Sequence, residues 1–169
     1  MSASTISADL VIEAFRPHDH GRCRATATAA VEAQCRARGL RLTPARACVL
    51  EALLEEHRAM TAYELLDRLR EAGLGSQPPV AYRALEFLVE NGFAHRIERL
   101  SAFVACAHAG VSHAAAFLIC RACRTVAEAS LPRLEAGLED CAAAQGFAVE
   151  RAVIEAEGLC ACCREAAAG

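Results

Sequence analysis

The sequence contains no lysine, so all 18 of its basic residues are arginines. It also lacks a positive net charge, because 21 acidic residues bring the formal charge to −3. A net-acidic chain is not the usual footprint of a nucleic-acid-binding protein. The arginines are unevenly spread, however, since residues 22–83 contain ten arginines and seven acidic residues. This local excess of positive charge is compatible with DNA binding by the N-terminal half.

Signals for secretion and for membrane insertion are absent as well. The first 15 residues have no basic start and place acidic residues inside their apolar stretch, unlike a secretion signal. Residues 100–120 lack Asp, Glu, Lys and Arg, but two histidines and many small residues make this run too polar to span a membrane. We expect a cytosolic protein with no membrane partner, and 169 residues suffice for one large or two small domains.

Cysteine, by contrast, is abundant, with ten residues in the chain. Disulfides are disfavoured in the cytosol, so these thiols are better explained as metal ligands or as buried apolar groups. Cys120 and Cys123 form one C-x2-C pair, and Cys160 and Cys163 form another. Two such pairs supply four soft ligands at about 2.3 Å, the geometry of a structural zinc site. Four buried cysteines are the alternative, and Cys162 could take the place of Cys163.

The N-terminal half predicts helices separated by short turns and followed by a hairpin. Residues 24–39 show helical periodicity, Thr43 and Pro44 begin a second helix, and Thr61 and Glu64 form a capping box for a third. Pro79 opens a fourth helix that ends at residues 91–92. Two short strands follow, over residues 93–98 and 102–106. This order is typical of a winged helix-turn-helix domain.

The C-terminal half predicts a small α+β unit. Strands are expected over residues 116–119 and 125–128, an amphipathic helix over 131–145 and an alternating strand over 147–155, ahead of the last cysteines and a polar tail.

Two looser groups of residues are further candidates for metal binding. His95, Cys106, His113 and Glu128 spread over 34 residues, and their two nitrogens, one sulfur and one oxygen suit Zn²⁺ better than Fe²⁺ or Mn²⁺. Spacing alone supports this group only weakly, and His108 competes for either histidine position. The second group lies near the N-terminus, where a polar tail is the favoured interpretation; its members are His18, Asp19, His20 and Cys23.

For DNA contact, Tyr63 and the adjacent Tyr82 and Arg83 lie early in the two helices that follow turns. The start of a recognition helix faces the major groove, where arginine bonds guanine edges or phosphates. The alternatives are an ordinary surface arginine and two half-buried tyrosines.

Several of these segments together resemble the ferric uptake regulator family, and within it the zinc uptake regulator branch. The segments are RLTPARACVLEAL, TAYELLDRLRE, PPVAYRALEFLVENGFAHRIE, FLICRAC and IEAEGLCACC, and the match covers the chain from about Cys35 to Arg164. The resemblance implies a homodimer in which each chain has a winged-helix DNA-binding domain (22–105), a hinge (106–113) and a small α/β dimerisation and metal-binding domain (114–169). The N-terminal residues lie before the match and lack strong periodicity, so residues 1–21 are expected to form a mobile arm.

The resemblance also implies roles for individual residues. Cys120, Cys123, Cys160 and Cys163 would hold structural zinc, and His95, Cys106, His113 and Glu128 would form the zinc-sensing site, giving two zinc ions per chain. Loaded dimers would then bind an AT-rich inverted repeat in zinc-uptake promoters and repress them. Tyr63 and Arg83 would contact DNA, and Asp67 and Arg70 would link neighbouring dimers.

The choice of zinc rests on the residues before the first cysteine pair. Iron-sensing members usually have a His-rich stretch there, whereas this chain reads HAAAFLIC and adds the soft ligand Cys106. An iron or peroxide sensor is the alternative within the family. A zinc enzyme is the alternative outside it, although no dedicated general base is visible.

Two positions depart from the family pattern. Val80-Ala81 stand where Thr-Val is common, which predicts a lost helix cap or phosphate contact, and Arg124 stands where glycine is common, which predicts strain if φ is positive.

Overall fold

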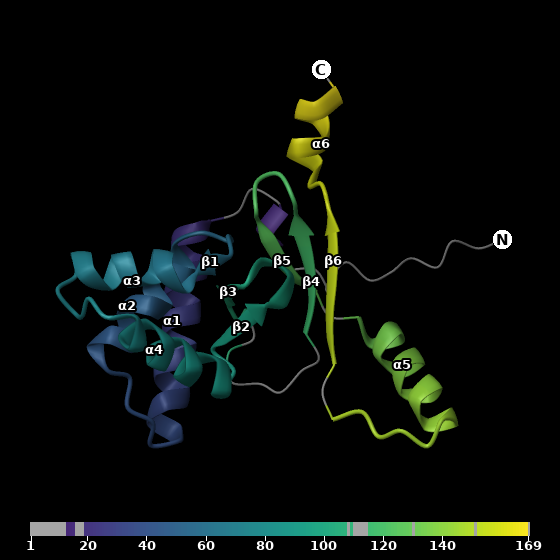
Figure 1. The fold of residues 1–169 in the computed structure, drawn as a ribbon, viewed down its shortest axis with the longest axis horizontal. Helices are drawn as coiled ribbons and strands as arrows, with labels where there is room; N and C mark the ends of the chain where they lie inside the picture. Colours follow the sequence, from purple (N-terminus) through teal and green to yellow (C-terminus); the bar gives the residue numbers. More distant parts are fainter. Residues whose placement is uncertain are drawn as a thin grey trace.

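The chain folds into a helical part and a sheet-containing part that meet along one side (Figure 1). The structure is a computed structural model that describes residues 13–15, 19–107, 109, 115–129, 131–150 and 152–168. A short 3₁₀ turn at Glu13–Phe15 comes first. The helical part then consists of α1 (His20–Ala37), α2 (Pro44–Glu55), α3 (Ala62–Glu71) and α4 (Pro78–Glu90).

Local capping explains where these helices begin. α1 starts four residues before the predicted position, because the Asp19 side chain accepts a hydrogen bond from the Arg22 backbone N–H at 3.0 Å. Thr43 caps α2 as predicted. The capping box at α3 is confirmed, since Glu64 N donates to Thr61 Oγ1 and Thr61 N donates to Glu64 Oε2.

The start of α4 corrects one prediction about capping. Gln77 occupies the N-cap position without a side-chain hydrogen bond, and Pro78 is the first helical residue, one position before the predicted Pro79. Val80 therefore lies inside the first turn, so the predicted loss of a capping hydroxyl at this position is wrong.

The predicted hairpin is confirmed as a wing of three strands. β2 (Ala94–Ile97) and β3 (Ala102–Ala105) pair antiparallel around a 3₁₀ turn at Glu98–Leu100. A short strand that the sequence did not predict, β1 (Met60–Thr61), pairs with the other edge of β3 to give the order β1-β3-β2. Apolar side chains of all four helices fill the core behind this wing, among them Val31, Leu50, Leu65 and Leu85. Phe93, between α4 and β2, is buried in the same core.

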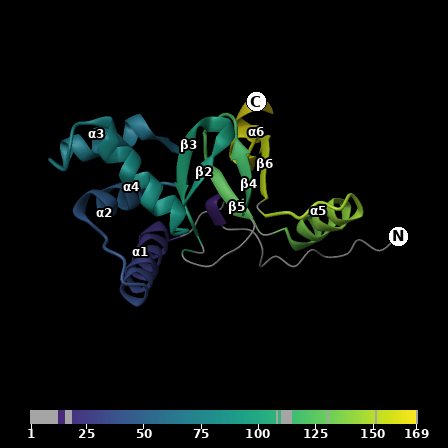
Figure 2. The same ribbon diagram turned by 60° about the horizontal axis from the view of Figure 1, so that its bottom comes forward.

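The sheet-containing part consists of β4 (Ala115–Cys120), β5 (Val126–Ala129) and β6 (Val153–Gly158) in the order β5-β4-β6. β4 pairs antiparallel with β5 and parallel with β6. The predicted helix is confirmed as α5 (Pro132–Ala144), and the two views show it projecting away from the helical part (Figure 2).

Two predictions for the C-terminus differ from the structure. The last strand begins at Val153, and residues 147–150 are not in a strand. The expected polar tail forms a helix, α6 (Ala161–Ala168), directly after Cys160. No helix in the described ranges is both long and apolar enough to cross a membrane.

The two parts share an apolar junction. Ile97, Ala102 and Val104 of the wing pack with Phe117 and Ile119 of β4 in one buried cluster. The polar contacts around this cluster also join the two parts. Val126 N donates to the His57 carbonyl at 2.8 Å, and the Glu155 side chain accepts hydrogen bonds from the backbone N–H groups of Glu98 and Arg99.

We predict that Thr61→Ala destabilises the protein by about 1 kcal/mol, because it leaves an N-terminal backbone donor of α3 without its hydroxyl acceptor. Urea unfolding at equal protein concentration measures the change. Gln77→Ala is the matched control, since Gln77 makes no side-chain cap bond. An equal loss of stability in both variants would contradict the capping explanation.

Candidate metal centres and DNA-contact surface

The two predicted cysteine pairs meet at one end of the second sheet. Cys120 ends β4, Cys123 lies in the turn toward β5, and Cys160 and Cys163 flank the start of α6. Parallel pairing of β4 with β6 aligns Cys120 with Gly158, so the two pairs lie side by side. The four sulfur atoms lie within 4.8 Å of one another, and the exposed Cys162 is not among them.

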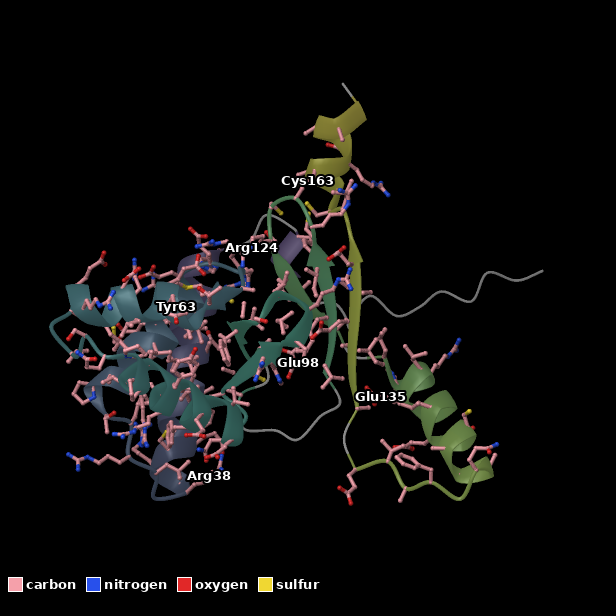
Figure 3. The ribbon with its side chains drawn as sticks, viewed as in Figure 1. Arg38, Tyr63, Glu98, Arg124, Glu135 and Cys163 are labelled. Atoms are coloured by element: carbon pink, nitrogen blue, oxygen red, sulfur yellow. The ribbon has the colours of Figure 1, made fainter. Side chains whose placement is uncertain are left out.

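This end of the sheet is visible in Figure 3, where Arg124 and Cys163 are both labelled near the top of the strands. Arg124 has φ 61°, so the condition for the expected backbone strain is met. Its N–H donates to the Cys120 carbonyl at 2.9 Å, which holds the turn between the first two cysteines closed.

Hydrogen bonds shift the pKa values of these thiols in opposite directions. Backbone N–H groups of Cys123 and then Cys160 lower the pKa of Cys120 to about 6. Hydrogen bonding to Cys160 and then to Cys120 raises the pKa of Cys163 to about 12, since Cys163 then donates as a thiol. Without metal the cluster therefore holds one thiolate readily, and a divalent cation must displace protons from the others.

Three of the four residues of the predicted sensing site come together at the junction. His95 of β2, Cys106 after β3 and Glu128 of β5 place their ligand atoms within 4.8 Å of one another. His95 Nε2 lies 3.4 Å from Glu128 Oε1, and the Ala107 backbone N–H donates to Glu128 Oε2 at 3.0 Å. Cys106 is buried and only 6% of Glu128 is exposed. His113 and its competitor His108 lie outside the described residues.

This pocket has a clear structural origin. His95 and Glu128 lie on different sheets, and they face each other because the wing packs against β4 and β5. The Phe117 ring lies 5.2 Å from the His95 ring and helps to exclude water beside it. A nitrogen, a sulfur and a carboxylate oxygen in a dry pocket are donors that suit Zn²⁺.

A third group has a member that the sequence did not predict. His20 and Cys23 lie in the first turn of α1, whereas the sequence favoured a polar tail, and His57 joins them from the segment after α2. The ligand atoms of these three residues also lie within 4.8 Å of one another. His57 stands 34 positions after Cys23 with no motif around it, so no local signal could have found it. His18 lies outside the described residues.

The residues predicted to contact DNA are exposed on the helical part. Tyr63, labelled in Figure 3, lies in the first turn of α3 and is 68% exposed, while Tyr82 of α4 is 51% exposed. Neither is a half-buried core residue. Arg83 is also exposed, one position after Tyr82.

Asp67 and Arg70 pair with each other along α3. Arg70 Nη1 donates to Asp67 Oδ1 at 2.7 Å, and both side chains are exposed. A contact with another molecule would compete with this pair, which at the surface is worth at most about 1 kcal/mol.

Comparison with known proteins identifies the family. A sequence model of the ferric uptake regulator family matches residues 37–157. The chain belongs to the ferric uptake regulator family. It is 43% identical over 138 residues to the zinc uptake regulation protein of Escherichia coli strain K12, and to that of Shigella flexneri, and the matched region is 81% of each chain.

Solved structures of family members match this chain to different degrees. A zinc uptake regulator complexed with zinc and DNA matches with a TM-score of 0.81 at 41% identity, covering 86% of this chain and 98% of that one. Holo XcZur matches with a TM-score of 0.75 at 42% identity, and the match covers 84% of this chain and 99% of that one. Apo XcZur matches with a TM-score of 0.50 at 43% identity, and the match covers 85% of this chain and 99% of that one. The ferric uptake regulator of Vibrio cholerae gives 0.50 at 25% identity, covering 75% and 96%.

We predict that the zinc-stripped protein releases at least about two protons when its first zinc equivalent binds at neutral pH. The thiols of Cys160 and Cys163, whose pKa values are raised, must lose protons to become ligands. Affinity should accordingly rise with pH and fall as the solution is acidified. Titration calorimetry in buffers of different ionisation enthalpy measures the release.

Cys162→Ser is the control for this experiment, because Cys162 is an exposed neighbour outside the cluster. It should release as many protons as the wild type, whereas Cys163→Ser should release fewer. Equal release by all three proteins would contradict the assignment of Cys163.

Proposed function

We propose that this protein is a zinc-responsive transcriptional repressor that binds operator DNA of zinc-uptake genes as a zinc-loaded dimer. The observation that supports this most directly is the group of His95, Cys106 and Glu128, which joins the wing to the second sheet. A metal ion there connects the parts that must hold a fixed orientation for a dimer to grip two half-sites. As a DNA regulator the protein would act in the cytoplasm.

The two metal sites have different tasks. Cys120, Cys123, Cys160 and Cys163 hold a structural zinc that joins β4 and its turn to the start of α6. His95, Cys106 and Glu128, together with His113, hold the sensed zinc. Residues 106–113 then act as the hinge between a winged domain over 22–105 and a dimerisation domain over 114–169.

The energy needed for such a switch is within reach of zinc coordination. Moving the protein from 1% to 99% in the DNA-binding arrangement requires a preference of about 10⁴, or about 5.5 kcal/mol. Structural zinc sites bind with about 10–16 kcal/mol, so part of that energy suffices. The greater similarity of this structure to the holo than to the apo form of XcZur supports assigning it to the zinc-loaded state.

The second part offers a surface for a second copy of the chain. α5 has no buried residue, and Leu134, Leu138, Phe147 and Val153 are exposed apolar side chains on or after it. Large apolar side chains exposed in this way are typical of protein–protein interfaces. A two-fold dimer would present its two winged domains to the two halves of an inverted repeat.

Iron or peroxide sensing, the alternative within the family, has less support than zinc sensing. Identity to zinc uptake regulators is 41–43%, against 25% to the iron-family structure from Vibrio cholerae. The thiolate donor of Cys106 also favours zinc over iron. The protein is a regulator and not an enzyme, in keeping with the relatives it matches along most of its length.

We predict that Cys106→Ser holds about one zinc ion fewer per chain than the wild type and loses zinc-dependent binding to a duplex with an AT-rich inverted repeat. Elemental analysis after mild chelation and gel-shift titration measure the two effects. Cys162→Ser is the control, because Cys162 is an exposed cysteine outside the metal groups. Unchanged zinc content and unchanged DNA binding in Cys106→Ser would contradict the proposed sensing site.

We predict that Arg83→Ala weakens operator binding by about 1–3 kcal/mol if Arg83 reads a guanine. If it contacts a phosphate, the slope of log affinity against log salt should become shallower by about one. Arg164→Ala, which changes an exposed arginine of α6, removes the same charge far from α4. Equal effects of the two substitutions would show that Arg83 contributes only net charge.

A further inference from the structure

The group of His20, Cys23 and His57 has the geometry of a metal site. His20 and Cys23 are three positions apart in α1, which places both side chains on one helix face. His57 approaches from the segment between α2 and β1, with its ring centroid 4.9 Å from that of His20. All three residues are half-buried, and their ligand atoms lie within 4.8 Å of one another.

A backbone carbonyl sets the tautomer of His20. His20 Nε2 lies 2.5 Å from the Glu55 carbonyl oxygen, which can only accept a hydrogen bond. In the neutral ring Nε2 therefore holds the proton, and Nδ1 has the lone pair that a metal requires. Hydrogen bonds of this kind orient the histidine ligands of most protein metal sites.

This group and the sensing site share one cavity. The cavity has a volume of about 430 Å³, and the residues that line it include His20, Cys23 and His57 as well as Cys106 and Glu128. An ion that enters this space can therefore approach both the three residues of this group and two residues of the sensing site.

The backbone of His57 also connects the two parts of the chain. Its carbonyl accepts the hydrogen bond from Val126 N, two residues before Glu128 in β5. Beyond it, Arg58 forms an isolated bridge with Thr125. α1 belongs to the helical core through Val31 and Cys35. The contacts from α1 to His57, and the hydrogen bond from Val126 to His57, thus connect the start of α1 to the strand that carries Glu128.

We propose that His20, Cys23 and His57 bind a further zinc-class ion, which clamps the start of α1 to the junction and strengthens the zinc response of DNA binding. Two imidazole nitrogens and one thiolate favour Zn²⁺ over Mg²⁺ or Ca²⁺. Three protein ligands leave a fourth position for water or for an exchanging ligand. The DNA part of this proposal rests on the proposed repressor function, whereas the metal site does not.

The test compares zinc content and zinc affinity of the full-length wild type with those of Cys23→Ser and His57→Gln. Each variant should hold about one zinc ion fewer per chain, with the remaining ions unaffected. Cys162→Ser should match the wild type, because Cys162 is exposed and outside the metal groups. Cys23→His, which replaces one metal ligand with another, should retain the ion, and this separates loss of a ligand from damage to the helix.

The second measurement is the free zinc concentration at half-maximal binding to the inverted-repeat duplex. In Cys23→Ser and His57→Gln this free zinc concentration should rise by at least about fivefold. A factor of about five is the lower end of the usual coupling between two binding sites. Cys23→His should stay close to the wild type.

The results separate the two proposals. Equal zinc content in the wild type, Cys23→Ser and His57→Gln would overturn the further site, and the group would be only a polar start to α1. Reduced content with unchanged zinc dependence of DNA binding would overturn its role in the response. If the wild type binds no operator at any zinc concentration, the repressor function fails, while the zinc counts still decide whether the site exists.

Discussion

The burial of the Glu128 carboxylate is the constraint on which the arrangement of the two parts depends. A charge with 6% exposure is costly unless nearby groups compensate it, and here His95 and the Ala107 backbone N–H do so in part. The carboxylate becomes buried only when the wing lies against β4 and β5. A divalent cation bound at this point would stabilise that arrangement, because it would add positive charge where desolvation is most unfavourable.

The apolar junction couples the burial of the Glu128 carboxylate to the position of the wing. Ile97 and Val104 pack with Phe117 and Ile119, so movement of the wing would expose a buried cluster and the carboxylate together. The Glu155 side chain holds the backbone at the wing tip at the far end of the same interface. Closure therefore involves hydrophobic burial, hydrogen bonds and charge at once, which suits a transition between two discrete states.

The sequence predicted most elements whose signals are local. Thr43, the capping box of Thr61 and Glu64, and the hairpin periodicity each determine a structure within a few residues. The strand at Val153 was displaced from its predicted start because its register is set by parallel pairing with β4, a partner distant in sequence. α6 replaces the predicted polar tail, and its Ala-rich composition favours a helix.

By itself the sequence determined the two cysteine pairs and the kind of metal they suit, because a two-residue spacing places both thiols of a pair within reach of one ion. It also named His95, Cys106 and Glu128, although only the family resemblance gave them weight. Tertiary structure alone decided that Glu128 is buried beside His95 and that His57 meets His20 and Cys23. The reason is that a ligand set drawn from separate helices and strands exists only after packing brings their backbones together.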